Sequence, residues 1–300
     1  MSYITSKLIG YLRLMRPANI ITAIADILAG VAISGFLTEV YIDSLDILPI
    51  ACLCLATMGL YGGGVVFNDV MDADLDKEER PERPIPSGVI SRTQAIVLGG
   101  YLLVVGILAA FTVGRISGWL AVGITITALV YDKWGKHHAF LGPFNMGLCR
   151  GLNLLLGISI VVPALMDYWW MAFIPIIYIA AVTNISRDEV HGGSVKRLRI
   201  TAVCYAGVYI TMGVLAFLQH HIWIALPFIV LFAFMINRPL LRAMKDPSGP
   251  NIGKAVKGGI IALIAMNAAW AAAFASLPYA LLVLLLLPIS ILISRMFAVT

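Results

Sequence analysis

The chain has 300 residues, of which 60% are hydrophobic and 12% are charged, and its mean hydropathy is +0.93. About a quarter of the residues of a soluble domain are charged, so this composition excludes an ordinary soluble protein and indicates a polytopic membrane protein. The net charge of +5 requires no nucleic-acid partner, because Lys and Arg in cytoplasmic loops orient membrane proteins.

The first 16 residues predict a helix that lies on the membrane surface. Apolar side chains alternate there with Lys7 and Arg13, which is typical of an amphipathic helix at the lipid–water interface. We expect no cleavable signal peptide, because the first long apolar run begins only at Pro17 and is long enough to span a bilayer.

Ten apolar runs of spanning length fill the rest of the chain. They cover roughly residues 17–37, 46–67, 92–113, 116–132, 142–163, 168–186, 199–218, 221–237, 256–276 and 279–296. The last run closely follows Pro278, so a half-span or a laterally packed helix is an alternative there. We therefore expect an all-α integral membrane protein with nine to ten transmembrane helices.

These runs predict a single domain over residues 1–300. Its expected parts are the surface helix at 1–16, a first four-helix half at 17–132, a second four-helix half at 142–237 and C-terminal helices at 256–296. If the N-terminus is cytoplasmic, 19 of the 21 Lys and Arg residues fall on or beside the cytoplasmic side. The positive-inside rule predicts this orientation.

The densest group of carboxylates lies in residues 68–88, directly after the second apolar run. If the helix continues, Asn68, Asp72 and Asp76 share one face, with Asp69 beside them. Like charges at this spacing repel each other, so we expect a bound cation, and ligands that are all oxygen favour Mg²⁺. A solvated acidic cap at a helix end is the alternative.

An internal repeat relates the two halves. A Pro-x-Asn pair opens the first and the fifth run, and an Asn-x-x-x-Asp pair ends the second and the sixth. The pairs are Pro17 with Asn19, Pro143 with Asn145, Asn68 with Asp72, and Asn184 with Asp188. Such repeats are common in membrane proteins, and here they predict that both Asn-plus-Asp helix ends face one central cavity on the cytoplasmic side.

The connections on that side carry groups that a diphosphate requires. Carboxylates hold Mg²⁺ on a phosphate, while Lys and Arg neutralise the remaining oxygens. Besides the acidic stretch, the candidates are Arg80, Arg83, Tyr131, Lys136, Arg187, Asp188, Glu189 and His191. Each basic residue also has an ordinary interpretation as an anchor at the membrane boundary.

The sequence N-D-x-x-D-x-x-x-D, followed by R-P-x-R-P-I-P-S-G, resembles the first aspartate-rich motif of the UbiA superfamily of intramembrane prenyltransferases. The R-P-x-N start of the first span, at residues 16–19, and the pattern Tyr131, Lys136, Asn145 are similar too. Within this superfamily the sequence is most similar to the archaeal digeranylgeranylglyceryl phosphate synthases, the chlorophyll synthases and a UbiA-like branch of bacterial gene clusters, EboC. The sequence S-R-D-E-V-H-G-G favours the last of these. A bacterial inner membrane is therefore expected, with the active site facing the cytoplasm.

The resemblance implies a Mg²⁺-dependent enzyme that transfers an isoprenoid from a prenyl diphosphate to a lipophilic or aromatic acceptor, which the sequence does not identify. The expected fold surrounds a central cavity with helices. Candidate metal ligands are Asn68, Asp69, Asp72, Asp76, Asn184, Asp188 and Glu189. Candidate substrate contacts are Asn19, Arg80, Arg83, Tyr131, Lys136, Asn145, Arg150 and Arg187. Candidate catalytic residues are Asp72, Asp76, Tyr131 and Lys136.

The second acidic motif departs from the family pattern. Asn184 stands where the family has the first aspartate, so at least one carboxylate is missing. This departure favours an alternative function, in which the protein binds a prenyl lipid or assists assembly in a biosynthetic pathway without catalysing transfer.

Two charged residues lie inside predicted spans. Asp26 is ten residues into the first span and Arg150 about eight residues into the fifth. A helix rises ~1.5 Å per residue, so both lie at a similar depth, and we predict that they pair at the floor of the cavity. A functional role and a structural tie between the halves both remain open for this pair.

Overall fold

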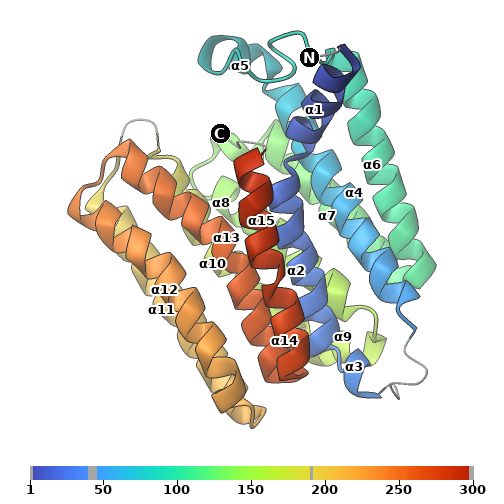
Figure 1. Cartoon of the computed structure of the whole chain (residues 1–300), viewed down its shortest axis with the longest axis vertical. Helices are drawn as coiled ribbons and strands as arrows, with labels where there is room; N and C mark the ends of the chain where they lie inside the picture. Colours follow the sequence, from blue (N-terminus) through green and yellow to red (C-terminus); the bar gives the residue numbers. More distant parts are fainter. Residues whose placement is uncertain (1–2, 40–45, 190–191, 297–300) are drawn as a thin grey trace.

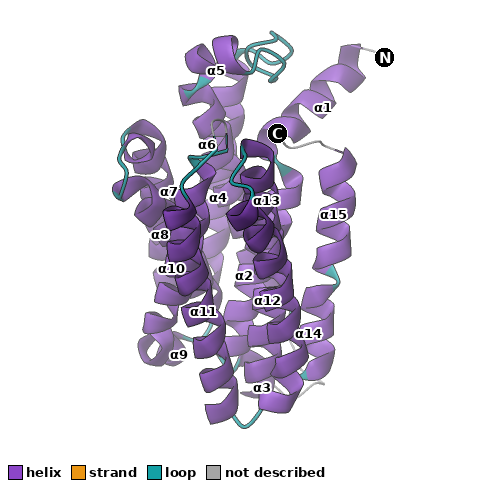
Figure 2. Ribbon diagram, turned by 90° about the vertical axis from the view of Figure 1, so that its left-hand side faces the viewer, coloured by secondary structure: helices purple, strands orange, loops and turns teal. Residues whose placement is uncertain are grey.

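The computed structural model describes residues 3–39, 46–189 and 192–296, and all regular structure in these ranges is helical (Figure 1). The long helices run side by side along the long axis of the molecule, as a view at right angles also shows (Figure 2). The all-α fold expected from the apolar runs is confirmed.

The helices follow the expected apolar runs closely. In chain order they are α1 (Tyr3–Met15), α2 (Pro17–Ile33), α3 (Phe36–Glu39), α4 (Leu48–Met71), α5 (Ala73–Glu79), α6 (Arg92–Val113), α7 (Arg115–Lys133), η2 (Gly135–His137), α8 (Leu141–Ile158), α9 (Val162–Tyr168), η3 (Trp169–Ala172), α10 (Phe173–Ser186), α11 (Val195–Leu218), α12 (Ile222–Lys245), α13 (Gly249–Phe274), α14 (Leu277–Leu284) and α15 (Leu286–Met296).

Judged by length and apolarity, fewer helices than expected can span a membrane. In the described part of the chain, seven helical segments meet both criteria, and the bent pair of α1 and α2 makes an eighth. The last predicted run is among them, as α14 and α15 together. The helices α7 and α8 occupy predicted runs without meeting the criteria, so nine to ten spans are not confirmed.

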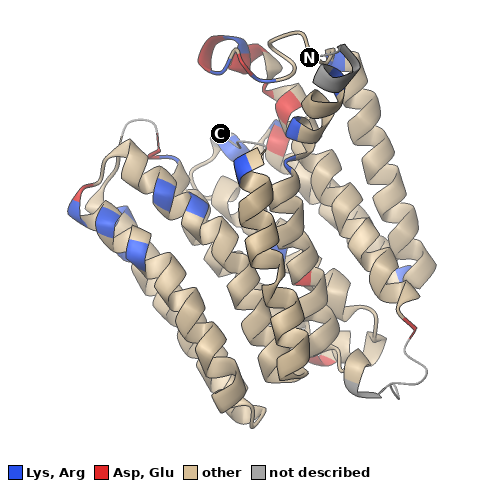
Figure 3. Ribbon diagram, in the orientation of Figure 1, with Lys and Arg blue, Asp and Glu red and all other residues tan. Residues whose placement is uncertain are grey.

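Charged residues gather at one end of the bundle, where α1 and α5 lie (Figure 3). The opposite end carries few charges (Figure 3). Between the two ends, large apolar side chains such as Val203 in α11 and Phe234 in α12 are exposed. An apolar belt between a charged end and a weakly charged end is what a bilayer requires. The chain is therefore a multi-pass membrane protein.

The helices α2 and α8 pack against each other with almost no space between their backbones. A Cβ atom at Gly30 would lie 2.6 Å from the carbonyl oxygen of Leu154, and one at Gly157 would lie 2.5 Å from that of Ile27. Small residues allow membrane helices to approach this closely. The contact lies in the C-terminal turns of α2 and α8, about one turn beyond Asp26 and two turns beyond Arg150.

Candidate functional site

A cavity of about 320 Å³ lies between α2, α4, α7, α8, α10 and α13. Its polar end, the mouth, is formed by Arg16 before α2 and by Asn68, Tyr131, Asp132 and Ser186, each within the last four residues of its helix. The apolar side wall consists mainly of Leu60, Val65, Ile124, Ala128, Met146, Ile179, Val182, Val256 and Ile260. The mouth lies at the charged end of the bundle.

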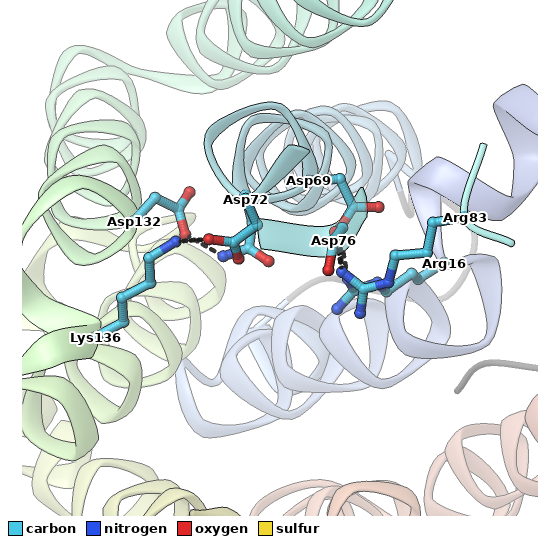
Figure 4. Close-up of polar contacts among 8 residues, drawn as sticks. Arg16, Asp69, Asp72, Asp76, Arg83, Asp132 and Lys136 are labelled. Carbon is cyan, nitrogen blue, oxygen red and sulfur yellow. Dashed lines mark hydrogen bonds and ion pairs between the residues drawn. The ribbon is translucent and has the colours of Figure 1, made fainter. Parts of the chain in front are cut away.

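The first acidic motif begins inside α4 and continues through α5. The helix breaks at Asp72, but the backbone amides of Asp72 and Asp76 still bond to the carbonyls of Asn68 and Asp72, at 2.9 and 2.8 Å. The expected spacing of four residues is therefore preserved. The side chains separate into two groups, one that contains Asp69 and Asp76 and one that contains Asp72 (Figure 4).

In the first group, two arginines neutralise two buried carboxylates. Arg16 lies 2.6 Å from Asp69, and Arg83 lies 2.7 Å from Asp76 and 3.5 Å from Asp69 (Figure 4). Arg16 has a φ of 49°, and this left-handed backbone turns the chain by 41° between α1 and α2. Arg83 thus binds the acidic helix α5 to the end of α4, and Arg16 binds the start of α2 to it.

In the second group, Asn68 and Asp72 meet residues of α7 and η2. The side-chain amide of Asn68 donates to Asp132 at 2.8 Å, and the ammonium of Lys136 donates to Asp72 (Figure 4). Asp132 was missed by the sequence analysis, although it directly follows Tyr131 and the apolar run that ends there. Its burial and its place on the mouth make it a candidate functional residue.

The second acidic motif is arranged differently from the first. Asp188 pairs with Arg197 at 2.5 Å, and Arg187 donates to the carbonyls of Lys136 and His138 at 3.0 and 2.7 Å. Burial raises the pKa of the Glu189 carboxyl, while the positive charge of Arg80 acts in the opposite direction. Another candidate, His191, lies outside the described residues.

The predicted repeat is only partly visible in the cavity. Among the described residues, Asn19 and Asn68 line the cavity, whereas their counterparts Asn145 and Asn184 do not. In α10 the lining positions include Thr183 and Ser186 instead. The second half of the chain therefore contributes hydroxyl groups to the mouth where an acidic motif was expected.

The donors at the mouth fit one Mg²⁺ ion in their chemistry. Within the described ranges no three His, Cys, Asp or Glu side chains stand close enough together to hold a metal. Asn68, Asp72 and Asp132 nevertheless supply amide and carboxylate oxygens, which Mg²⁺ prefers. The contact of Lys136 with Asp72 shows that this position already attracts a cation.

The floor of the cavity confirms the predicted pair of buried charges. Arg150 donates to Asp26 at 2.7 Å and to Thr22 at 2.7 Å. Asn153 also donates to Asp26, at 3.1 Å, and Asn267 donates to its other oxygen at 2.7 Å. The network therefore joins α2, α8 and α13. The parts played by Thr22 and Asn267 could not be foreseen, because neither residue stands out in an apolar run.

The model of the family described as the UbiA prenyltransferase family matches residues 28–250. Two relatives are named digeranylgeranylglyceryl phosphate synthase. The one from Methanosarcina mazei is 29% identical over 219 residues, which is 69% of this chain and 76% of that protein. The one from Ignicoccus hospitalis is 28% identical over 195 residues, so the match spans 63% of this chain and only 59% of that protein.

Solved structures share the fold. A UbiA homologue from Aeropyrum pernix gives a TM-score of 0.68 at 14% identity, covering 92% of this chain and 98% of that one. A UbiA homologue from Archaeoglobus fulgidus bound to GPP and Mg²⁺ gives 0.61 at 16% identity, covering 83% and 99%. Since the family model covers most of the sequence and the fold agrees, the chain belongs to the UbiA prenyltransferase family.

Proposed function

We propose that the protein transfers a prenyl group from a prenyl diphosphate to an acceptor. The observation that carries this proposal is the polarity of the cavity, which has a charged mouth and an apolar wall. A prenyl diphosphate has the same distribution of charged and apolar groups, with two phosphates at one end of a hydrocarbon chain. Ligand sites of this kind combine an apolar lining with a few polar groups that fix orientation.

In this proposal the charged groups at the mouth bind the diphosphate. Mg²⁺ would be held by Asn68, Asp72 and Asp132, and when bound it neutralises charge on the departing diphosphate. Lys136 would exchange its contact with Asp72 for one with a phosphate oxygen, assisted by Arg16. The apolar wall would exclude water from the allylic cation left by the departing diphosphate, until the acceptor attacks it.

The names of the relatives favour a glycerol phosphate as the acceptor over an aromatic ring. Transfer to a hydroxyl forms a carbon–oxygen bond, breaks the bond to the diphosphate and releases one proton. We propose further that the mouth faces the cytoplasm, because Lys and Arg gather at that end of the bundle. The relatives are archaeal, so they give no support to a bacterial membrane.

The test is to incubate the purified protein and Mg²⁺ with labelled prenyl diphosphates, with and without a glycerol phosphate lipid, and to measure released diphosphate and prenylated product. Asp72→Ala should abolish release. Asp74→Ala is the matched control, because Asp74 lies two residues away, is exposed, and pairs with Lys77 and Arg92 on the surface. Release that persists in Asp72→Ala would contradict the proposed site.

A second candidate is a protein that binds the prenyl diphosphate without turning it over. Two observations favour it. Asp188 is engaged by Arg197, and no cluster of three acidic side chains able to hold a metal occurs in the described part of the chain. Tight binding of a labelled prenyl diphosphate with no release at any Mg²⁺ concentration would support this candidate against the enzyme.

A further inference from the structure

The floor of the cavity is a layer of polar side chains in the middle of an apolar bundle. We call it the polar floor, and it consists of Thr22, Asp26, Thr57, Arg150, Asn153 and Asn267. All six side chains are buried. Three of them, from α4 and α8, also line the cavity. The cavity is therefore closed, at the end opposite the mouth, by polar rather than apolar atoms.

The polar floor is held by its own hydrogen bonds. Both oxygens of Asp26 accept bonds. The amide of Asn153 donates to Asp26 and to the carbonyl of Ala23, and its oxygen accepts from Thr57 at 2.7 Å. Arg150 also lies over the ring of Tyr61, at 5.1 Å. Buried polar networks are rigid when their groups are satisfied, so this floor has a fixed depth.

The depth of the cavity can be measured along α4. Its cavity-facing side includes Asn68 at the mouth, then Gly64 and Tyr61, and Thr57 at the floor. Eleven residues separate the first from the last, which corresponds to ~16 Å at the rise of an α-helix. The hydrocarbon part of a bound substrate therefore has a limited length available inside the bundle.

Contact with the polar floor does not stabilise a bound apolar chain. Arg150 has five N–H groups, which is more than its interactions with Asp26, Thr22 and Tyr61 use. Covering the rest with hydrocarbon would desolvate them without a partner, which is unfavourable. The end of a prenyl chain should therefore stop short of Arg150, and a longer chain would have to bend out of the cavity.

Between mouth and floor, α4 contributes a glycine, Gly64, to the lining of the cavity. A Cβ atom at Gly64 would meet only the Cβ of Ala128, at the ordinary contact distance of 3.4 Å. A larger side chain at Gly64 would therefore extend into the cavity rather than into the packing of the helices. This glycine keeps the middle of the cavity wide.

We infer that the polar floor and Gly64 together set the length of prenyl chain that the site accepts. The inference rests on the proposed function, because it assigns the apolar part of the cavity to the prenyl chain. It makes Gly64 and Arg150 determinants of specificity. Neither residue touches the diphosphate in this arrangement.

The experiment measures binding and turnover separately, with dimethylallyl, geranyl, farnesyl and geranylgeranyl donors. Binding is measured with the slowly reacting thiolodiphosphate analogues, and turnover with the diphosphates. The variants are Gly64→Leu and the milder Gly64→Val. The matched control is Gly100→Leu on α6, where an added Cβ meets nothing within 4 Å and the residue does not line the cavity. A fourth variant, Asp26→Asn with Arg150→Met, makes the floor less polar and uncharged.

For the unsubstituted protein, the affinity for the analogues should rise with the length of the prenyl group and then level off or fall. Gly64→Leu should weaken binding of the longer analogues by about 10-fold or more, the effect of filling a pocket by methylenes, and leave the dimethylallyl analogue unchanged. Gly100→Leu should behave as the natural chain. The double variant should shift the preferred length upward.

Equal effects of Gly64→Leu on all four lengths, or none, would overturn the inference, as would an unchanged length preference in the double variant. Its failure is distinguishable from failure of the proposed function. A clear length limit in binding without release of diphosphate from any donor leaves the inference standing and removes the transferase. Release of diphosphate that does not depend on the length of the prenyl group supports the transferase and overturns the inference.

Discussion

Arg150 donates a hydrogen bond to Asp26 at 2.7 Å in the middle of the helix bundle, between positions 124 residues apart in the sequence. Their side chains are only 8% and 2% exposed. Each residue alone would be a strongly unfavourable charge in an apolar surrounding. Together with the amides of Asn153 and Asn267 they form a neutral, hydrogen-bonded layer, so the two residues depend on each other.

Removing the cation alone should destabilise the protein strongly. Arg150→Met leaves the carboxylate of Asp26 buried without a counter-charge, and removal of one partner from a buried pair costs about 3–5 kcal/mol. The double change with Asp26→Asn should recover most of this loss, because the remaining amide can still accept from Asn153 or Asn267. The measurement is the temperature of aggregation in detergent, followed by size-exclusion chromatography.

Arg242→Met is the control, because Arg242 is exposed near the end of α12 and its loss should change the stability little. If the double variant is no more stable than Arg150→Met alone, the two residues do not stabilise the fold as a pair.

Because α2 and α8 pack closely, a single methyl group added at their contact should destabilise the protein. In Gly157→Ala the new Cβ would lie 2.5 Å from the carbonyl oxygen of Ile27, so the helices must move apart. Overpacking of this kind costs about 1–3 kcal/mol, and it should also lengthen the contact between Arg150 and Asp26. Gly100→Ala, at a site with open space around it, should have no comparable effect on thermal stability in the same assay.

Much of this arrangement follows from sequence. The apolar runs predict the helices because a bilayer fixes their length, and equal depth in two spans predicts the pair of Asp26 and Arg150. The charged stretch at residues 68–88 marks the mouth for a similar reason, since carboxylates are unfavourable within lipid. These predictions depend only on position along a helix, which the sequence records directly.

The rotation of a helix about its axis is harder to predict. Thr183 and Ser186 line the cavity and Asn184 does not, because successive residues differ by ~100° around a helix. Since the apolar residues of α10 are spread around the whole helix, its pattern gives no preferred face. The partners of Asp69 and Asn68 are also missing from the sequence pattern, because Arg16 and Asp132 reach them from distant parts of the chain.

Arg83 should hold the acidic helix α5 in place. It is 11% exposed and bonds to Asp76 at 2.7 Å, so Arg83→Gln should cost about 1.5–3 kcal/mol, the range for hydrogen bonds to charged groups. Limited proteolysis should then cut residues 73–91 faster. Arg92→Gln is the matched control, because Arg92 pairs with exposed Asp74 at 3.3 Å on the surface. Equal proteolysis of both variants would contradict a role of Arg83 in holding α5.

The bond from Asn68 to Asp132 predicts a change in metal dependence. A carboxylate only accepts hydrogen bonds, so Asp132 holds the amino side of the Asn68 amide at 2.8 Å and leaves the carbonyl oxygen free for a cation. In Asp132→Asn the new amide can both donate and accept, so the orientation of Asn68 is no longer fixed and one candidate ligand charge is lost. Loss of ligands or of their supporting groups typically weakens metal affinity by about 10–100-fold.

We therefore expect Asp132→Asn to require about 10–100-fold more Mg²⁺ for half-maximal release of diphosphate, with a smaller loss of rate at saturating Mg²⁺. Binding of Mn²⁺ without substrate, followed by electron paramagnetic resonance, should weaken in parallel, and this readout does not depend on turnover. Glu78→Gln is the control, because Glu78 is exposed on α5 and should leave both measurements unchanged. A lower rate with unchanged Mg²⁺ and Mn²⁺ affinities would show that Asp132 serves the reaction without acting on the cation, and the assignment of Asn68 and Asp132 as its ligands would then be wrong.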